Sequence, residues 1–168
     1  MKKVLLFLLS FLTMTAAKAN PLEIGAPAPA VDALNQDGNT ISLPDLYKEG
    51  LVLVYFYPKA DTPGCTAQAC SLRDDFVQLK ERGVEIVGVS TDSVAAQKKF
   101  QEKYNLPFTL LADEDGKVVE AFGVPKRGAY ASRQAFLIHE DKIVWRDLKA
   151  STAEQAKDLL AALDQLKL

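Results

Sequence analysis

The only two cysteines of this 168-residue chain lie in one short segment, PKADTPGCTAQAC, which runs from Pro58 to Cys70. Cys65 and Cys70 are separated by four residues, so they do not form the CxxC pair that is typical of disulfide oxidoreductases. Cysteine thiolates act as nucleophiles, as redox centres and as metal ligands. The segment therefore predicts thiol chemistry, and the elements around it indicate which kind.

The residues before Cys65 predict a helix N-terminus at the carboxyl end of a buried strand. Leu51–Tyr57 is a continuous apolar and aromatic run of strand length, and Pro58 ends it. Thr62 is of a type that caps helices, and Pro63 suits the first helical turn. Cys65 then lies in that turn, where unpaired N–H groups and the helix dipole favour a thiolate over a thiol. This is the setting of a reactive nucleophile.

Cys70 lies five positions farther along the predicted helix. Five residues of an ideal helix rise about 7.5 Å and turn about 500°, which places the two Cα atoms roughly 8.5–9 Å apart. A disulfide needs a Cα separation of roughly 4.4–6.8 Å. Either the bridge is permanent and the helix is absent, or the helix unwinds locally when the bond forms. Because the sequence after Cys70 is typical of a helix, it favours a redox cycle coupled to local unfolding.

Strand and helix patterns alternate along the rest of the chain, which predicts an α/β domain with a mixed sheet. NQDGN, residues 35–39, predicts a turn between two short extended pieces. Ser93 or the preceding Asp92 is the expected cap of one helix, and Gly83 is the expected end of another. The predicted strands are Leu51–Tyr57, Val84–Ser90, Phe108–Ala112, Gln134–His139 and Lys142–Leu148, and the predicted helices are Thr66–Arg82 with its start near Pro63, Ser93–Tyr104 and Thr152–Leu166.

The first nineteen residues have the three-part pattern of a secretory signal peptide. A positive start precedes the apolar run Val4–Met14, and the small-x-small cleavage signal AKA ends at Ala19. The apolar run is shorter than the roughly 18–20 residues that span a bilayer. We therefore expect cleavage after Ala19, a single domain over residues 20–168, a periplasmic or secreted location and no stable membrane association.

Charge and motifs exclude several other classes of protein. The formal net charge is −2, and residues 1–19 contribute three lysines and no acid to it, so the remainder is more acidic still. A mildly acidic domain argues against nucleic-acid binding and offers no polybasic footing for a membrane. VSTDS lacks the glycines and the lysine of a phosphate-binding loop. We expect no cofactor and no resident metal.

PKADTPGCTAQAC, with the following SLRD, resembles the active-site segment of the peroxiredoxins, in particular their Q-type, bacterioferritin-comigratory-protein-like branch. Pro58, Thr62 and Cys65 match the proline, threonine and peroxidatic cysteine of the family, and Cys70 matches the resolving cysteine of the branch. Arg133, in SRQAFLI, matches an arginine that enters a late strand. The similarity extends over the whole of residues 20–168 and includes the segments GAPAPAVDAL, VEIVGVSTDS and FTLLADEDG. It implies a thioredoxin-like fold, with a central mixed β-sheet flanked by helices, and a thiol peroxidase.

The resemblance also implies a role for each matching residue. The Cys65 thiolate attacks a hydroperoxide and becomes a sulfenic acid, and Cys70 converts this acid into an intramolecular disulfide that a thioredoxin-like protein reduces. Arg133 supplies positive charge to the thiolate and the transition state. The Thr62 hydroxyl holds thiolate and peroxide in line, and Pro58 shields the pocket from water. Because both cysteines belong to one chain, we expect a monomer.

Two other functions stay open on the residues alone. An exported thiol–disulfide oxidoreductase of the thioredoxin type would share the α/β fold, but the cysteine spacing and the predicted threonine and arginine suit a peroxide better. A copper carrier could bind Cu(I) through Cys65, Cys70 and His139. An offset of five in a helix, however, does not direct both thiols at one ion.

Two further polar residues have simpler interpretations. His139 is the only histidine, and it follows a strand at a turn, so we expect a solvated or packing side chain. Arg73 lies about two helical turns beyond Cys65, where a salt bridge with Asp74 or Asp75 is expected.

Overall fold

The computed structural model describes residues 20–168; the predicted signal peptide, residues 1–19, lies outside the described part of the chain. A seven-stranded sheet in the order β2-β1-β5-β4-β3-β8-β9 forms the centre of this part. Its strands are β1 Asp32–Asn35, β2 Thr40–Ser42, β3 Leu51–Phe56, β4 Val84–Ser90, β5 Thr109–Ala112, β8 Gln134–His139 and β9 Lys142–Asp147. Strands β3, β4 and β5 are parallel, and the other pairings are antiparallel, so the predicted mixed sheet is confirmed.

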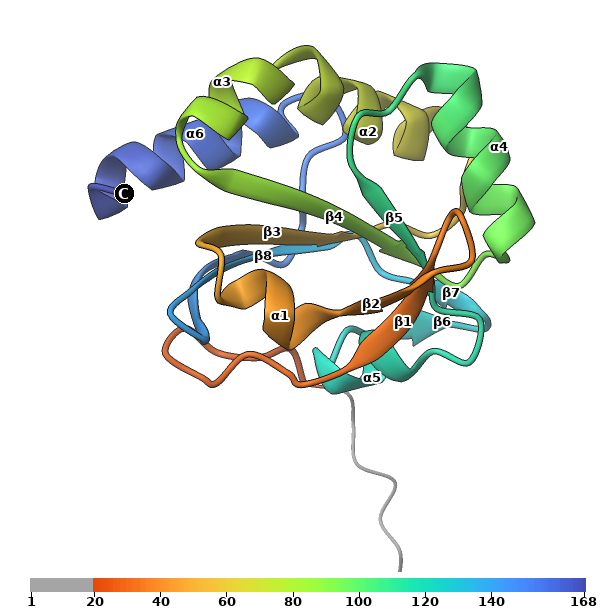
Figure 1. Cartoon of the computed structure of the whole chain (residues 1–168), viewed down its shortest axis with the longest axis horizontal. Helices are drawn as coiled ribbons and strands as arrows, with labels where there is room; N and C mark the ends of the chain where they lie inside the picture. Colours follow the sequence, from red (N-terminus) through yellow and green to blue (C-terminus); the bar gives the residue numbers. More distant parts are fainter. Residues whose placement is uncertain (1–19) are drawn as a thin grey trace, which may run out of the picture.

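Helices cover both faces of the sheet (Figure 1). α2, α3, α4 and α6 pack on one face, and the short helices α1 and α5 pack on the other. The helices are α1 Leu43–Tyr47, α2 Pro63–Asp74, α3 Phe76–Glu81, α4 Val94–Tyr104, α5 Lys117–Ala121 and α6 Gln155–Leu166. A small hairpin of β6 Lys126–Arg127 and β7 Tyr130–Ala131 stands outside the main sheet.

Strand β3 is apolar throughout because both of its faces are buried. Side chains of a strand alternate between its two faces. Leu51, Leu53 and Tyr55 therefore enter the core beneath α2 and α6, whereas Val52, Val54 and Phe56 enter the core on the side of α1 and α5. The strand is thus held on both sides, which gives the loop that follows it a rigid base.

The sheet register brings the start of β8 to the end of β3. The two strands are antiparallel, and Phe56 pairs with Gln134. Arg133, which directly precedes β8, is therefore placed next to the carboxyl end of β3, where α2 begins. Open α/β sheets bind ligands at this edge.

Several predicted elements differ from the observed ones. The helix predicted over residues 66–82 is two helices, because Asp75 leaves the helical region with φ −100° and ψ 14°. The last helix begins at Gln155 rather than Thr152. The pattern also missed α1, α5 and the β6–β7 hairpin, whose short lengths leave no room for a periodic signal. The ends at Gly83 and the cap at Ser93, which accepts a hydrogen bond from the Ala96 N–H, are confirmed.

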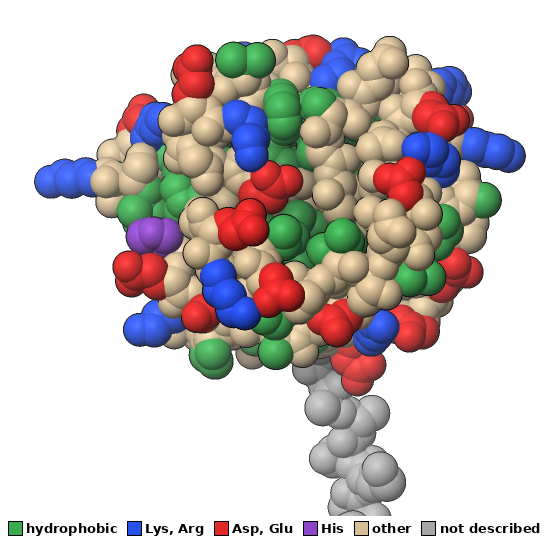
Figure 2. All heavy atoms as spheres, viewed as in Figure 1, with side chains coloured by type: hydrophobic (Ala, Val, Ile, Leu, Met, Phe, Trp, Pro, Cys, Tyr) green, Lys and Arg blue, Asp and Glu red, His purple; other side chains and the backbone are tan. Residues whose placement is uncertain are grey.

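Acidic and basic side chains are interspersed on the face of the described residues that Figure 2 shows. This mixed surface is consistent with the mild net charge of the chain. Within residues 20–168, no helix combines the length and the apolar character that crossing a membrane requires.

Candidate active site

Cys65 lies in the first turn of α2, as predicted. Its side chain is 2% exposed, and Cys70 lies farther along the same unbroken helix in a half-buried position. Both thiols are free. The structure therefore contains the reduced pair in an intact helix rather than a permanent bridge.

Hydrogen bonds and an ion pair hold successive residues of the loop between β3 and α2. The Ala60 N–H donates to a carboxylate oxygen of Asp92 at 2.7 Å. Asp61 adopts a left-handed conformation, with φ 58°, and its carboxylate binds the Lys103 ammonium at 2.8 Å and accepts from the Tyr104 hydroxyl at 2.7 Å. The hydrogen bond from Lys103 is the main reason why the pKa of Asp61 is lowered. These contacts hold the start of α2 in a fixed position relative to α4.

Arg133 reaches the sulfur of Cys65 from the start of β8. Its Nη2 donates to Cys65 Sγ at 3.4 Å, and its Nη1 donates to the side-chain oxygen of Gln68. A Cβ atom on Gly64 would lie 3.2 Å from Arg133 Nη2, so the glycine gives the guanidinium room to approach the helix. The structure thus brings together Cys65 and Arg133, which are 68 residues apart in the sequence.

Two buried glutamines extend this contact into the core. Gln68 and Gln155 are both fully buried, and Gln68 Nε2 donates to Gln155 Oε1 at 2.9 Å. Neither residue was predicted to belong to the site. Each is a polar residue at a helix position that faces the core, and this pattern is the only signal in the sequence that could have marked them.

A buried tyrosine also escaped the sequence analysis. Tyr55 projects from β3 into the core cluster that contains Cys65, and its hydroxyl has no hydrogen-bond partner among the described residues. Burial raises the pKa of Tyr55 well above its usual value. The phenol therefore stays protonated and remains an unpaired donor near the sulfurs of Cys65 and Cys70.

The predicted cap residue Thr62 has the position of an N-cap without the side-chain bond. Its hydroxyl donates to the Lys59 carbonyl at 2.9 Å and caps no N–H group of α2. The cap prediction was therefore wrong for the side chain, because the hydroxyl turns back into the loop. The Thr62 backbone carbonyl accepts from the Thr66 N–H at 2.8 Å and closes the first turn.

A cavity of about 410 Å³ opens beside the arginine. It is lined by Pro58, Arg127, Tyr130, Ala131, Ser132 and Arg133. The Lys59 ammonium lies over the ring of Tyr130, 5.8 Å from its centroid. Cys65 is not part of the lining, and Arg133 connects the cavity with the sulfur. Pro58 thus lines the cavity beside Arg133, and its role in shielding the reacting group from water stays a prediction.

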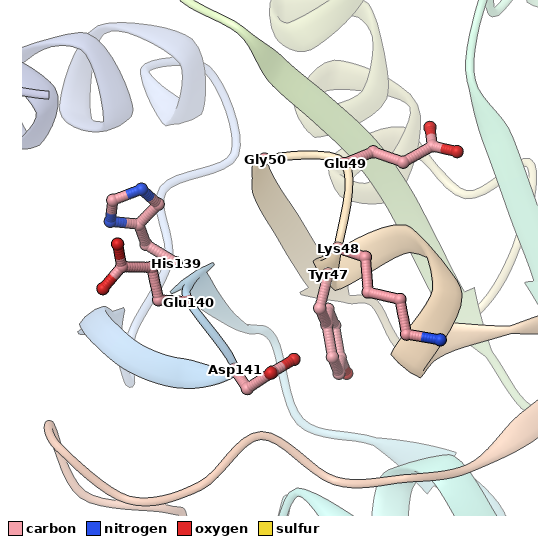
Figure 3. A pocket seen from close by; sticks show the side chains of 7 residues that line it. All are labelled: Tyr47, Lys48, Glu49, Gly50, His139, Glu140 and Asp141. Carbon is pink, nitrogen blue, oxygen red and sulfur yellow. The ribbon is translucent and has the colours of Figure 1, made fainter.

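His139 lies far from the cysteines. Because β8 runs antiparallel to β3, His139 is at the amino end of β3, whereas Cys65 follows its carboxyl end. A second cavity, of about 440 Å³, lies at that end of the sheet. In Figure 3, Asp141 points toward Tyr47, and the His139 imidazole points away from both. Within residues 20–168, no three side chains of metal-ligating type gather around one point. The three ligands of the copper hypothesis therefore do not meet.

Arg73 forms the predicted structural contacts. It binds Asp74 at 2.7 Å and donates to the Tyr104 carbonyl at 2.8 Å. The side chain ties α2 to the end of α4 and does not contact Cys65 or Arg133.

Comparison with known proteins identifies the family. The sequence model of the AhpC/TSA family matches residues 24–146. The putative peroxiredoxin bcp of Coxiella burnetii is 44% identical over 138 residues, which cover 76% of this chain and 91% of that protein. The chain belongs to the AhpC/TSA family and is a peroxiredoxin of the Bcp/peroxiredoxin Q type.

Two solved structures resemble this peroxiredoxin. Peroxidoxin BcpB from Mycobacterium tuberculosis superimposes with a TM-score of 0.80 at 33% identity, over 86% of this chain and 98% of that one. The bacterioferritin comigratory protein of Xanthomonas campestris, described with alkyl peroxide reduction activity and trapped intermediate and ligand complexes, superimposes with a TM-score of 0.76 at 27% identity, over 82% and 92%. The predicted thioredoxin-like fold and the predicted thiol peroxidase are confirmed.

Proposed function

We propose that this peroxiredoxin reduces hydrogen peroxide and organic hydroperoxides through a Cys65 sulfenic acid and an intramolecular Cys65–Cys70 disulfide. One observation carries the proposal. Arg133 Nη2 donates to Cys65 Sγ at 3.4 Å while the sulfur lies at the N-terminus of α2. A permanent cation and a helix dipole both stabilise a thiolate at that point.

In the first step, the Cys65 thiolate attacks the terminal oxygen of the hydroperoxide. A sulfur–oxygen bond forms, the oxygen–oxygen bond breaks, and the leaving oxygen takes a proton to give water or an alcohol. Negative charge moves onto the peroxide oxygens during this step. Arg133 and the N–H groups of the first turn of α2 are placed to stabilise that charge.

In the second step, Cys70 attacks the sulfenic acid, so that a disulfide forms and water leaves. An intact helix holds the two residues too far apart for this bond. The first two turns of α2 must therefore unwind between the steps. A thioredoxin-type dithiol then reduces the disulfide, and α2 re-forms.

The cavity beside Arg133 supports a substrate range that includes organic hydroperoxides. A volume of about 410 Å³ holds much more than hydrogen peroxide, and Pro58, Ala131 and the ring of Tyr130 provide apolar contacts. The Xanthomonas campestris relative, described for alkyl peroxide reduction, points to the same substrate class.

We further propose that the enzyme is exported and works as a monomer in the periplasm, after cleavage following Ala19. The contacts of the first described residues support the cleavage position: the Leu22 N–H donates to the Phe122 carbonyl, and Arg146 donates to the Pro21 carbonyl. A cut after Ala19 leaves these contacts intact. One chain supplies Cys65, Cys70 and Arg133, so the chemistry requires no second subunit.

Intact mass after one equivalent of hydrogen peroxide tests the function. The pre-reduced protein is compared with Cys70→Ser and Cys65→Ser. We expect an internal disulfide in the native protein, a trappable sulfenic acid in Cys70→Ser and no reaction in Cys65→Ser. A native protein that stays reduced, or that oxidises as readily at Cys70 as at Cys65, would favour a thiol–disulfide oxidoreductase instead.

A further inference from the structure

We propose that Gln155, the first residue of α6, is a positioning residue for the reaction of Cys65 with peroxide. It holds Gln68, and Gln68 holds Arg133 against the sulfur. This inference rests on the proposed function, because it assigns the support of the same reacting group.

The contacts form one continuous path. Arg133 Nη2 donates to Cys65 Sγ at 3.4 Å, and the neighbouring Nη1 of the same guanidinium donates to Gln68 Oε1. Gln68 Nε2 donates to Gln155 Oε1 at 2.9 Å. Both glutamines are fully buried, so water does not replace one of these bonds when it is lost.

The chemistry of the groups sets the orientation of each amide. A guanidinium has only donors, so Gln68 must present its oxygen to Arg133. Its NH₂ group then faces α6, and Gln155 must present its own oxygen to it. The Nε2 atom of Gln155 has no hydrogen-bond partner in the described part of the chain. This side chain therefore acts in the site through its oxygen alone, at the cost of a buried unpaired NH₂ group.

The buried groups that hold Arg133 do not neutralise its positive charge. Its direct buried support, Gln68, is a neutral amide, so it does not compete with the Cys65 thiolate for the positive charge of Arg133. Gln155 acts one step away, by holding the Gln68 amide in the orientation that fixes the guanidinium.

The same bond ties α6 to the part of α2 that must unwind. Gln68 lies between the two cysteines, and the Ala156 N–H donates to Ser71 Oγ at 3.1 Å one turn farther along. Forming the disulfide must break the Gln68–Gln155 bond, and reduction restores it. Loss of Gln155 should therefore slow the peroxide step without slowing the disulfide step.

Two substitutions separate positioning from packing. Gln155→Met removes the amide oxygen at similar volume, whereas Gln155→Glu keeps an acceptor oxygen in the same place and replaces the unpaired NH₂ group with a second carboxyl oxygen. A purely structural role predicts that Glu is the worse of the two, because burying an acid is costly and burying a thioether is not. A positioning role predicts the opposite order. Gln165→Met, at an exposed position of the same helix, is the matched control.

The experiment measures two rate constants for each pre-reduced variant, namely Cys65 oxidation by hydrogen peroxide and the subsequent disulfide formation, together with thermal unfolding. We expect Gln155→Met to oxidise roughly tenfold or more slowly, since small misplacements of a catalytic group have effects of this size. Gln155→Glu and Gln165→Met should stay within about twofold of the native rate, and disulfide formation should not slow in any variant. If Gln155→Met does not fold, Gln155→Ala takes its place with the same expectation.

A native rate in Gln155→Met, or a loss in Gln155→Glu as large as that in Gln155→Met, would overturn the inference. Failure of the proposed function looks different, because the native protein itself then does not form the sulfenic acid at Cys65. The inference alone fails when the native protein forms the sulfenic acid but the rate of Cys65 oxidation does not depend on an acceptor oxygen at position 155.

Discussion

At the scale of single residues, the site consists of the buried sulfur of Cys65 and the donors beside it. Arg133 already donates to Sγ in the reduced protein, whereas the Thr62 hydroxyl donates to the Lys59 carbonyl. Thr62 must therefore turn its hydroxyl toward the sulfur and the peroxide to act as the resemblance implies. Arg133 therefore contacts the sulfur before the substrate binds, whereas the hydroxyl of Thr62 does not.

Thr62→Val tests whether that hydroxyl takes part in the reaction. We expect the rate of Cys65 oxidation to fall about 100-fold, the usual effect of removing one donor from a developing anion. The free energy of unfolding should change by about 1 kcal/mol or less, because a single half-exposed hydrogen bond to Lys59 is lost. Thr62→Ser keeps the hydroxyl and should react at nearly the native rate. Equal rates in the valine and serine variants would leave Thr62 with a role in the loop only.

Four buried side-chain atoms of the described residues have no hydrogen-bond partner, namely the Tyr55 hydroxyl, Thr66 Oγ1, Gln134 Oε1 and Gln155 Nε2. Unpaired buried polar groups cost stability, and they are concentrated here at the sulfur site. These unpaired groups therefore lower the stability of the region in which α2 is proposed to unwind.

At the scale of elements, the proposed cycle requires two states of α2. The intact helix places Cys65 in its first turn for the peroxide step, and the proposed unwound form would let Cys70 reach the oxidised sulfur. The break at Asp75 limits the change, because it separates α2 from α3 and lets α3 keep its packing through Leu79.

Hydrogen exchange of the reduced and oxidised protein measures this change. In the disulfide form, the backbone amides of the first two turns of α2 should exchange at least about tenfold faster than in the reduced form, because the bond cannot form across an intact helix. The amides of α4 are the internal control and should exchange equally in both forms. Unchanged protection of α2 after oxidation would mean that the disulfide forms without unwinding.

At the scale of the whole molecule, the sheet brings the residues of the site together. Residues 20–23 pack against β9 and against Gly123. Arg146 on β9 donates to the carbonyls of Pro21 and Leu22 and forms an ion pair with Glu23. Gly123 packs against the backbone of Asn20 so closely that a Cβ atom would not fit between them. The first described residues are thus packed against the rest of the domain.

Fractionation of cells that express the full chain tests the export proposal. We expect the protein in the periplasmic fraction, with an intact mass that corresponds to residues 20–168. Ala19→Arg, which disrupts the small-x-small cleavage signal, should leave a longer form that still carries its leader. A soluble cytoplasmic protein with the mass of the uncut chain would contradict both the location and the cleavage site.

The local part of the site could be predicted from the sequence because neighbouring residues define it. An apolar run that ends at Pro58, a threonine–proline helix start and a cysteine in the first turn are all signals within a few residues of one another. The strands Val84–Ser90 and Gln134–His139 were predicted with their observed bounds, since burial of most of a strand is visible in its composition.

Only the tertiary structure decided how distant segments meet. The contact between Arg133 and Cys65 follows from the antiparallel register of β3 and β8, and no local pattern contains that register. The path from Gln68 to Gln155 depends on the packing of α2 against α6, and the separation of His139 from the cysteines depends on the direction of β8. The sequence by itself predicted Cys65 as the nucleophile, because helix start and strand end are local signals. The fold decided which groups lie beside its sulfur, because long-range packing sets those distances.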